Sequence, residues 1–426
     1  MLRRNAILGL AGLTTLVLVV DTGSATAQGK PTDWGGPLTV TQIDAPPTLN
    51  GYGTNLSSDA QRAMYTTLVP NGTGVTARLA VRDLPDGQPA LLDPDQFQLP
   101  VMSADGQYIG YSLPNSTPSP FPMGSYDVWV QNIATGETTK VSVAPDGTDA
   151  NSRSLGEQLS ETGRYVAFTS DASNLVDGDT NGVEDVFVRD LQTGVTTRVS
   201  VASDGTESDG DSAIAGLSAT GQYVLFRSTA SNLVPDDTNG TWDLFLHDMA
   251  TGTTSRVDVA NDGTQADGTP DFCYGAVSSD GRYVTFASDA SNLVAGDTNG
   301  VTDVFVRDLR RQQTSRVSVG PRGSQADGRS LCPLLSADGR YLAFVSEATN
   351  LVSGDTNDVG DVFLRDLGTR RTVRASVRPD GSQTSTWRAQ LDAISADGTA
   401  VAFQIPNQGM DPNSTDNSTQ AFLVRP

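Results

Sequence analysis

The sequence predicts an all-β protein, a seven-bladed β-propeller with four antiparallel strands in each blade. Four near-copies of one phrase, such as SDASNLVDGDTNGVEDVFVRDL, recur about 60 residues apart; they begin at Ser170, Ser228, Ser288 and Ser346. Such a period indicates a repeated unit whose hydrophobic surface is covered by its neighbours. Short apolar runs rich in Val, Tyr and Phe, bounded by Gly, Asp or Asn, indicate strands, and no helical period is sustained.

A second phrase, Ser-x-x-Gly-x-Tyr-x-x-Phe, gives the number of units. Strong and weaker copies begin at Leu56, Met102, Leu159, Leu217, Val277, Leu335 and Ile394. The first copy, LSSDAQRAMY, lacks the glycine, and its unit is short. We therefore predict seven blades, with a six-bladed ring as the alternative.

Each unit divides into four strands, A to D. The unit near Ala213 begins with small residues, as the crowded wall of a central channel requires, and its second and third strands are apolar on both faces because adjacent blades cover them. The fourth strand alternates, with Arg198 and Ser200 set against Val199 and Val201. We expect strand D to be the half-exposed outer edge.

The last unit has only three strands, over residues 391–395, 400–404 and 420–424, before the chain stops at Pro426. An isolated alternating segment, Leu38–Ile43, resembles the outer strands. We predict that it pairs with the strand around Phe422 and closes the ring, which also covers strand edges that would otherwise promote aggregation.

The N-terminus has the order of a secretory signal peptide. Basic Arg3 and Arg4 precede an apolar stretch over residues 6–20 and the small-residue site Ala25-Thr26-Ala27. We predict a signal peptide over residues 1–27 and a single propeller domain over 28–426, placed in the cell envelope, periplasm or extracellular space. An uncleaved membrane anchor is the alternative; after cleavage we expect no membrane insertion.

The chain is strongly acidic. Its 50 Asp and Glu against 28 Lys and Arg give a formal charge of −22. Such a surface repels nucleic acid and anionic lipid, whereas cations and basic proteins remain suitable partners. We expect a monomer.

The phrases Ser-x-Asp-Gly-Arg-Tyr-x-Ala-Phe and Asp-Val-Phe-Val-Arg-Asp-Leu resemble the WD40-like repeat of TolB-type propellers, often called PD40. The resemblance covers nearly the whole chain after residue 27. It implies an extracytoplasmic propeller that serves as a protein-binding platform. Only about ten residues separate Gln28 from the first strand, which leaves no room for the α/β domain of TolB. The Pal-binding role of TolB is therefore not carried over.

Successive loops of a four-stranded meander alternate between the two ends of a blade. The A–B and C–D turns are short, so the long B–C and D–A loops share the other face, which is the predicted functional face. There the repeat places candidate oxygen ligands in four loops: Asp179, Asn181, Asp185; Asp237, Asn239, Asp243; Asp297, Asn299, Asp303; and Asp355, Asn357, Asp361. The last blade has a looser version, Asp411, Asn413 and Asp416.

Three oxygen-bearing side chains within seven residues can contribute to a calcium site, which needs six to eight oxygens. The match to an EF-hand is poor, because the glycine comes early and a bidentate glutamate is missing. The alternative is that Asp and Asn form Asx-turns and shape the loop without metal. The sequence leaves both open, with calcium as the one candidate cofactor.

Catalytic groups are not evident. The single histidine, His247, replaces an arginine of strand C, and we single out none of the many acids as departing from the repeat. Trp129 lies in a predicted strand, whereas Trp242 and Trp387 lie in long loops and are open to sugar stacking. We predict a non-enzymatic scaffold that binds another extracellular or envelope protein, or a ligand. The alternative is a hydrolase or lyase acting on extracellular polysaccharide.

Two cysteines, Cys273 and Cys332, lie five and four residues before the strand-A serines Ser278 and Ser336 of adjacent blades. In an oxidising compartment they can bridge two blades across a loop of roughly 60 residues, which by chain entropy is worth about 4 kcal/mol. The alternative is a pair of buried thiols.

Overall fold

A computed structural model describes the chain in the ranges 34, 36, 38–43, 55–70, 75–92, 97–115, 125–271, 273, 275–384, 388–411 and 419–426. Residues 34–426 form one compact unit. The predicted signal peptide lies outside the described residues and stays a prediction. Within the described ranges, no helix has the length and apolar character needed to cross a membrane.

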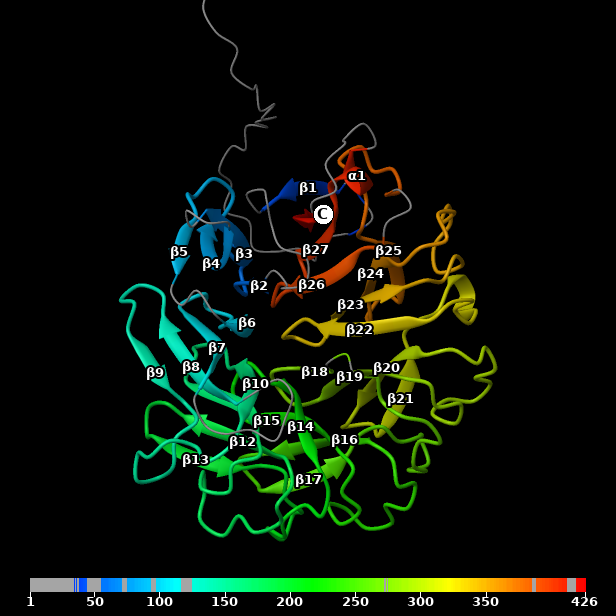
Figure 1. Cartoon of the computed structure of the whole chain (residues 1–426). Coiled ribbons are helices and arrows are strands. Elements are labelled where there is room, and N and C mark those ends of the chain that lie inside the picture. The colour runs from blue at the N-terminus through cyan, green and yellow to red at the C-terminus, as the bar shows by residue number, and fades with distance from the viewer. Residues whose placement is uncertain are drawn as a thin grey trace, which may run out of the picture. The chain divides into compact units, whose positions relative to one another are not determined.

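The seven predicted blades are confirmed. Seven four-stranded sheets follow one another, and in Figure 1 the first strand of each lies toward the centre. These innermost strands contact each other in turn around the ring, and β26 of the last blade contacts β2 of the first. The six-bladed alternative is therefore wrong.

Blades 3 to 6 carry the strong repeat, and their corresponding strands have the same lengths, except that β18 has only two residues. Their strands are β10 (Ser154–Leu159), β11 (Tyr165–Ser170), β12 (Asp185–Asp190) and β13 (Val195–Arg198); β14 (Ser212–Leu217), β15 (Tyr223–Ser228), β16 (Asp243–Asp248) and β17 (Thr253–Arg256); β18 (Ala276–Val277), β19 (Tyr283–Ser288), β20 (Asp303–Asp308) and β21 (Gln313–Arg316); and β22 (Ser330–Leu335), β23 (Tyr341–Ser346), β24 (Asp361–Asp366) and β25 (Arg371–Arg374). A short 3-10 turn, η1 (Pro321–Gly323), follows β21.

The second and third strands of each blade supply the core. In blade 3, Phe168 and Phe187 face each other in register, and their ring centroids are 5.8 Å apart. Both side chains are fully buried. Equivalent phenylalanine pairs stack in blades 4 to 7 at 5.6–5.9 Å. Burying one such ring contributes about 2–3 kcal/mol, so the repeated phenylalanines explain why blades 3 to 7 form the same central hairpin.

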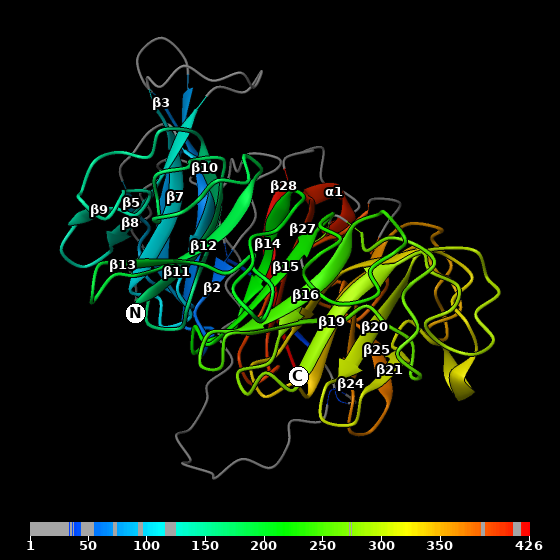
Figure 2. The same cartoon turned by 90° about the horizontal axis from the view of Figure 1, so that it is seen from below.

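Blades 1 and 2 deviate most from the repeat. Their strands are β2 (Asn55–Leu56), β3 (Arg62–Pro70), β4 (Val75–Asp83) and β5 (Ala90–Leu92), then β6 (Gln98–Met102), β7 (Tyr108–Pro114), β8 (Tyr126–Asn132) and β9 (Thr138–Lys140). With nine residues in each strand, the β3–β4 hairpin is longer than the six-residue hairpins of blades 3 to 6, and β3 reaches past neighbouring strands in Figure 2.

Blade 7 is closed by the N-terminal strand, as predicted. It consists of β26 (Gln390–Ile394), β27 (Val401–Pro406), β28 (Thr419–Arg425) and β1 (Thr39–Gln42), with a one-turn helix α1 (Asn407–Met410) after β27. The register places Gln42 opposite Phe422. Ile43 is fully buried, and the Trp34 indole donates a hydrogen bond of 3.0 Å to the Gly398 carbonyl.

The outer strands are shorter than predicted. We expected strand D of blade 3 to include Ser200 and Val201, but β13 ends at Arg198. The N–H of Val186, which a longer ladder would pair with backbone, donates instead to Ser200 Oγ at 3.1 Å. Val201 then turns back and pairs with Glu207. The serine of the repeat therefore ends the outer strand and starts the long loop.

Candidate functional site

The two faces of the propeller differ as predicted. The A–B and C–D turns are tight and use glycines at positive φ, for example Gly281 (φ +68°) and Gly194 (φ +73°). The B–C and D–A loops are long and leave the opposite ends of the same antiparallel strands. The long-loop face therefore holds the side chains that the sequence singled out.

The Asp-Thr-Asn-Gly loop of blade 3 is held by the last residue of the outer strand. Arg198 Nη1 lies 3.1 Å from the Asp179 carboxylate, 3.5 Å from Asp185 and 2.6 Å from Glu207. Asn181 Nδ2 donates to Asp185 at 2.9 Å. The Arg198 side chain is only 9% exposed. We call the arginine with its two aspartates the arginine brace.

The arginine brace recurs in the other strong repeats. Its members there are Arg256 with Asp237 and Asp243, Arg316 with Asp297 and Asp303, and Arg374 with Asp355 and Asp361. In blade 2, Lys140 replaces the arginine and lies 2.8 Å from Asp127. Burial raises the pKa of Asp179, Asp237 and Asp355 to about 6. The negative charge of the second aspartate of each brace raises this pKa further, and the positive charge of the arginine lowers it. The brace thus ties strands C and D to the B–C loop.

The structure therefore brings the three candidate calcium ligands of each strong repeat together. In every case the guanidinium group of the brace arginine lies between the two aspartates. The amide nitrogens of Asn239, Asn299 and Asn357 point at the strand-C aspartates at 2.9, 2.9 and 3.3 Å. Among the described residues, no group of three or more His, Cys, Asp or Glu side chains is placed to hold a metal ion. Asn413 and Asp416 of the looser version lie outside the described residues, and Asp411 precedes them.

Blade 4 breaks the pattern beside its brace. In blade 3 the Ser200 hydroxyl donates to Asp185, and Ser318 and Ser376 do the same in blades 5 and 6. Blade 4 has Asp258 at this position. Asp258 is fully buried, and within the described part of the chain neither of its carboxylate oxygens has a hydrogen-bond partner. Burial, followed by the charge of Asp243, raises its pKa well above the ordinary value.

The long loops are also tied to each other. Asp209, in a D–A loop, accepts hydrogen bonds of 2.7 and 2.8 Å from the backbone and hydroxyl of Ser231 in the next B–C loop. The same D–A loop also contacts the B–C loop of its own blade, where the Thr180 hydroxyl donates a hydrogen bond of 2.6 Å to the Glu207 carboxylate. Asp204, in the same D–A loop as Asp209, accepts a hydrogen bond of 2.9 Å from the backbone N–H of Thr206 in its own turn. The long-loop face is consequently a rigid rim.

A cavity of 260 Å³ opens among the inner strands of blades 3 to 5, at the end of the long loops. Arg153 lies at its edge and pairs with Asp171 at 2.9 Å and with Glu184 at 2.6 Å. Burial raises the pKa of Glu184 to about 7, with Arg153 opposing the rise. Beside it, the Arg227 guanidinium stacks 4.8 Å above the Trp242 ring.

Sequence reasoning missed this charged cluster because its members come from three separate loops. A signal was present at Glu184, since the equivalent positions hold Trp242, Thr302 and Gly360.

The remaining candidates are structural. His247 is buried, its Nδ1 is 2.9 Å from Thr254 Oγ1, and burial lowers its pKa. Trp129 is half-buried in β8, with Lys140 Nζ 5.8 Å above its ring. Trp387 lies outside the described residues.

Cys273 and Cys332 meet between blades 5 and 6. Their sulfur atoms are 2.07 Å apart, the separation of a disulfide, and no cysteine of the described chain is free. Of the two alternatives, the structure has the bridge. Cys273 lines the cavity described above, so the disulfide fixes one wall of the channel mouth.

The solved structures that match with a TM-score above 0.5 include a propeller domain and a peptidase. The β-propeller domain of the Trilobed protease from Pyrococcus furiosus, which has an open velcro topology, is 9% identical; the match covers 83% of this chain and 91% of that chain at a TM-score of 0.51. An acylaminoacyl peptidase from Pyrococcus horikoshii is 10% identical, and 91% of this chain covers only 52% of that chain at 0.52.

TolB structures are also among the matches. TolB from Acinetobacter baumannii is 15% identical, with 91% of this chain and 98% of that chain covered at a TM-score of 0.40. No family model and no curated protein matches the sequence. At these identities the likeness shows the fold alone, a β-propeller.

Proposed function

We propose that the protein is a secreted, non-enzymatic scaffold that binds another extracellular or envelope protein through its long-loop face. The observation that carries the proposal is the rigid rim, in which braces and cross-ties fix every strong-repeat B–C loop on both sides. A face that is ordered before binding loses little conformational entropy on association. The predicted signal peptide and the TolB-like fold support the location and the class of partner.

Four equivalent exposed positions lie at the tips of the B–C loops: Asp177, Pro235, Ala295 and Ser353. The test changes three of them and leaves Pro235 unchanged. Immobilised protein is incubated with the native extracellular fraction, and the Asp177→Lys, Ala295→Lys and Ser353→Lys variants are compared with wild type. Because these side chains are exposed, the variants should fold. We expect a partner captured by wild type to be lost from at least one variant.

Glu161→Lys, on an exposed A–B turn of the opposite face, is the matched control and should keep the partner. If all variants, the control included, capture the same proteins as wild type, the long-loop face is not the binding surface.

One observation favours the alternative, an enzyme acting on extracellular polysaccharide. Glu184 has a pKa of about 7 beside a cavity, which suits a general acid or base at neutral pH. Trp242 is the nearby aromatic side chain that could stack on sugar. Cleavage of acidic and neutral polysaccharides, measured as new reducing ends or as unsaturated sugar absorbance, and its loss in Glu184→Gln would support this function; no cleavage would leave the scaffold.

A further inference from the structure

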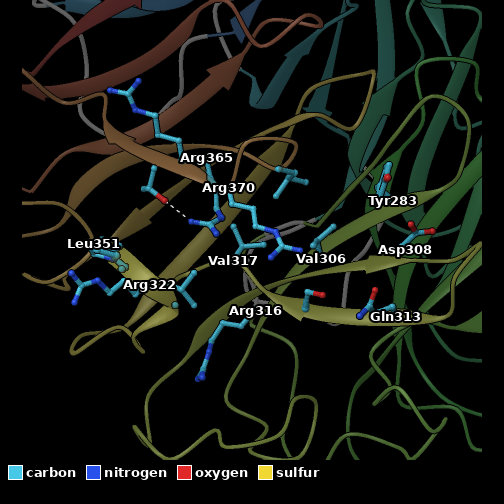
Figure 3. A pocket seen from close by; sticks show the side chains of 18 of the residues that line it. Tyr283, Val306, Asp308, Gln313, Arg316, Val317, Arg322, Leu351, Arg365 and Arg370 are labelled. Atoms are coloured by element: carbon cyan, nitrogen blue, oxygen red, sulfur yellow. Dashed lines mark hydrogen bonds between the residues drawn. The ribbon is translucent and has the colours of Figure 1, made fainter. Parts of the chain in front are cut away.

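A groove of 810 Å³ separates blades 5 and 6 on the outer side of the molecule (Figure 3). Its walls are β21 and η1 on one side and, on the other, the third and fourth strands of blade 6, β24 and β25. Six of its described lining residues are arginines, and one, Asp308, is acidic. The arginines are Arg311, Arg316, Arg322, Arg365, Arg370 and Arg371. In a chain of net charge −22, this concentration of positive charge is local to the groove.

Three departures from the repeat converge there. The first is a charge reversal in the D–A loop after β21. The other four strong or moderate repeats have aspartate at this position: Asp146, Asp204, Asp262 and Asp380. Blade 5 has Arg322, which is exposed and adopts a positive φ of 61°. The substitution exchanges a negative for a positive charge at the rim of the groove.

The second departure leaves the groove open. In the two preceding interfaces, the outer strand of the next blade is tethered to this loop: Thr254 N donates to Ser203 Oγ at 2.9 Å, and Thr314 N donates to Asn261 Oδ1 at 2.6 Å. Pro321 stands at the equivalent place before blade 6 and offers no side-chain acceptor. Pro145 and Pro379 occupy the equivalent position in two other blades, so the missing tether alone does not distinguish this interface. The missing tether opens space between the blades, and the arginines make that space positively charged.

The third departure is in the C–D turn of blade 6. Arg370 has a φ of 60° at the place where Gly136, Gly194 and Gly252 take positive φ in blades 2, 3 and 4. An arginine in this region is conformationally strained, and such strain is typically retained at functional sites. Arg370 and the adjacent Arg371 extend the positive surface along β25.

Three of the six arginines of the groove, Arg322, Arg365 and Arg370, are without an acidic partner in the described chain, whereas Arg311 lies 3.8 Å from Asp308. Arg316 belongs to a brace, 2.9 Å from Asp297, and Asp308 is engaged by Arg282 at 2.7 Å. Within the described residues, no acidic side chain forms an ion pair with Arg322, Arg365 or Arg370. Arg365 donates only to Thr372 Oγ1 at 2.8 Å, and burial together with the charge of Arg370 lowers its pKa. These guanidinium groups therefore have charge available for an anion.

We propose that the groove between blades 5 and 6 binds an extended acidic peptide segment of a partner protein. Guanidinium groups pair with carboxylates in a bidentate geometry, which favours Glu and Asp side chains. The groove is flanked by β21 and β25, each of which is the edge strand of its sheet. A peptide backbone can add to such an edge, whereas a polysaccharide cannot use it. The volume lies within the roughly 300–1,000 Å³ of ligand sites.

The proposal rests on the proposed function in taking a protein as the ligand. The groove adjoins the long-loop face at the D–A loop that carries Arg322 and extends from there along β21 and β25. The test measures binding of a fluorescent peptide with alternating Glu and Val to the full protein by anisotropy, at low and at 0.5 M salt. The same peptide with Gln for Glu is the uncharged probe, and a heparin oligosaccharide is the sulfated polysaccharide probe.

The variant for the test is Arg322→Asp/Arg370→Gly, which restores the residues of the other blades and should therefore fold. Arg329→Asp, an exposed arginine on the long-loop face, is the control for overall charge. We expect salt-sensitive binding of the acidic peptide that weakens at least 10-fold in the groove variant and less than 2-fold in the control.

Equal weakening in both variants, or binding of the Gln peptide as tightly as the Glu peptide, would overturn the proposal. Binding of heparin alone would replace the peptide by a sulfated polysaccharide. If the peptide binds while no partner is captured through the long-loop face, the proposed function fails and the groove stands; the reverse result leaves the scaffold without this groove.

Discussion

The long-loop face and the groove between blades 5 and 6 both contain many arginines, but they differ in whether acidic side chains neutralise the guanidinium charge. On the long-loop face, Arg198 is enclosed by Asp179, Asp185 and Glu207, and the same arrangement recurs from blade to blade. In the groove, Arg322 and Arg370 replace residues of the repeat and have no acidic partner in the described chain. The arginines that repeat build the blades, whereas Arg322 and Arg370, which break the repeat, have charge available for binding.

The largest effect that would test this comparison concerns closure of the ring, on which both regions depend. Deleting residues 36–44 removes β1, four ladder pairs with β28 and the buried Ile43. We expect a fall in melting temperature of more than 10 °C, because blade 7 loses its outer strand. A deletion of equal length in the 116–124 segment is the control. An unchanged melting temperature would show that β1 does not hold the ring.

Breaking one brace should have the next largest effect. Arg198→Ala leaves the buried carboxylates of Asp179 and Asp185 without their cation, so we expect a loss of about 2–4 kcal/mol in the free energy of unfolding. Urea denaturation measures it. The control is Arg388→Ala, whose side chain is 54% exposed and 3.8 Å from Glu347, and which should change stability by less than about 0.5 kcal/mol. Equal effects would remove the distinction between braced and surface arginines.

Restoring the repeat in blade 4 should stabilise the protein. Asp258→Ser replaces a buried carboxylate by the hydroxyl that the other braces use, with an expected gain of about 1–3 kcal/mol at pH 7. Because folding raises the pKa of Asp258, the aspartate favours the folded state only while it is protonated. Wild-type stability relative to the variant therefore falls as pH rises above about 4, the ordinary aspartate value.

Urea denaturation at pH 4 and pH 7 checks the sign: the gain in stability should be smaller at pH 4 than at pH 7. A variant that is less stable than wild type at pH 7 would mean that the Asp258 carboxylate has a partner in solution.

In the groove, Arg370→Gly should act in the opposite direction to Arg198→Ala. Glycine adopts a φ of 60° without steric strain, so we expect stability to rise by about 0.5–1 kcal/mol. Thermal unfolding measures it, and Arg371→Gly, inside β25, is the control that should destabilise. A loss of stability in Arg370→Gly would show that this arginine is part of the fold.

The smallest effect is expected from calcium. Because a guanidinium lies between the candidate ligands of each brace, we expect the melting temperature to be the same in millimolar Ca²⁺ and in EDTA. A rise with Ca²⁺, and its loss in Asp297→Asn but not in Asp177→Asn, would show that the loops bind the metal after all.

Much of the fold could be predicted because the information is local and repeated. The B-strand phrase Tyr-x-x-Phe and the glycine turns give each hairpin its register, so the seven blades and their faces follow from one unit. The ends of the outer strands could not be predicted, since Ser200 stops β13 through a hydrogen bond to Val186 on another strand. The channel-mouth cluster of Arg153, Asp171 and Glu184 was missed for the same reason.

The sequence by itself determined the number of blades, the closing strand and the acidic loops, because periodicity and alternation report directly which side chains share a face. Only the tertiary structure decided what the loop acids do, since the Arg198 that satisfies Asp179 is 19 residues away along the chain and belongs to another strand. It also decided where the exceptions meet: Arg322 and Arg370, on different blades, become neighbours in one groove through the packing of blade against blade.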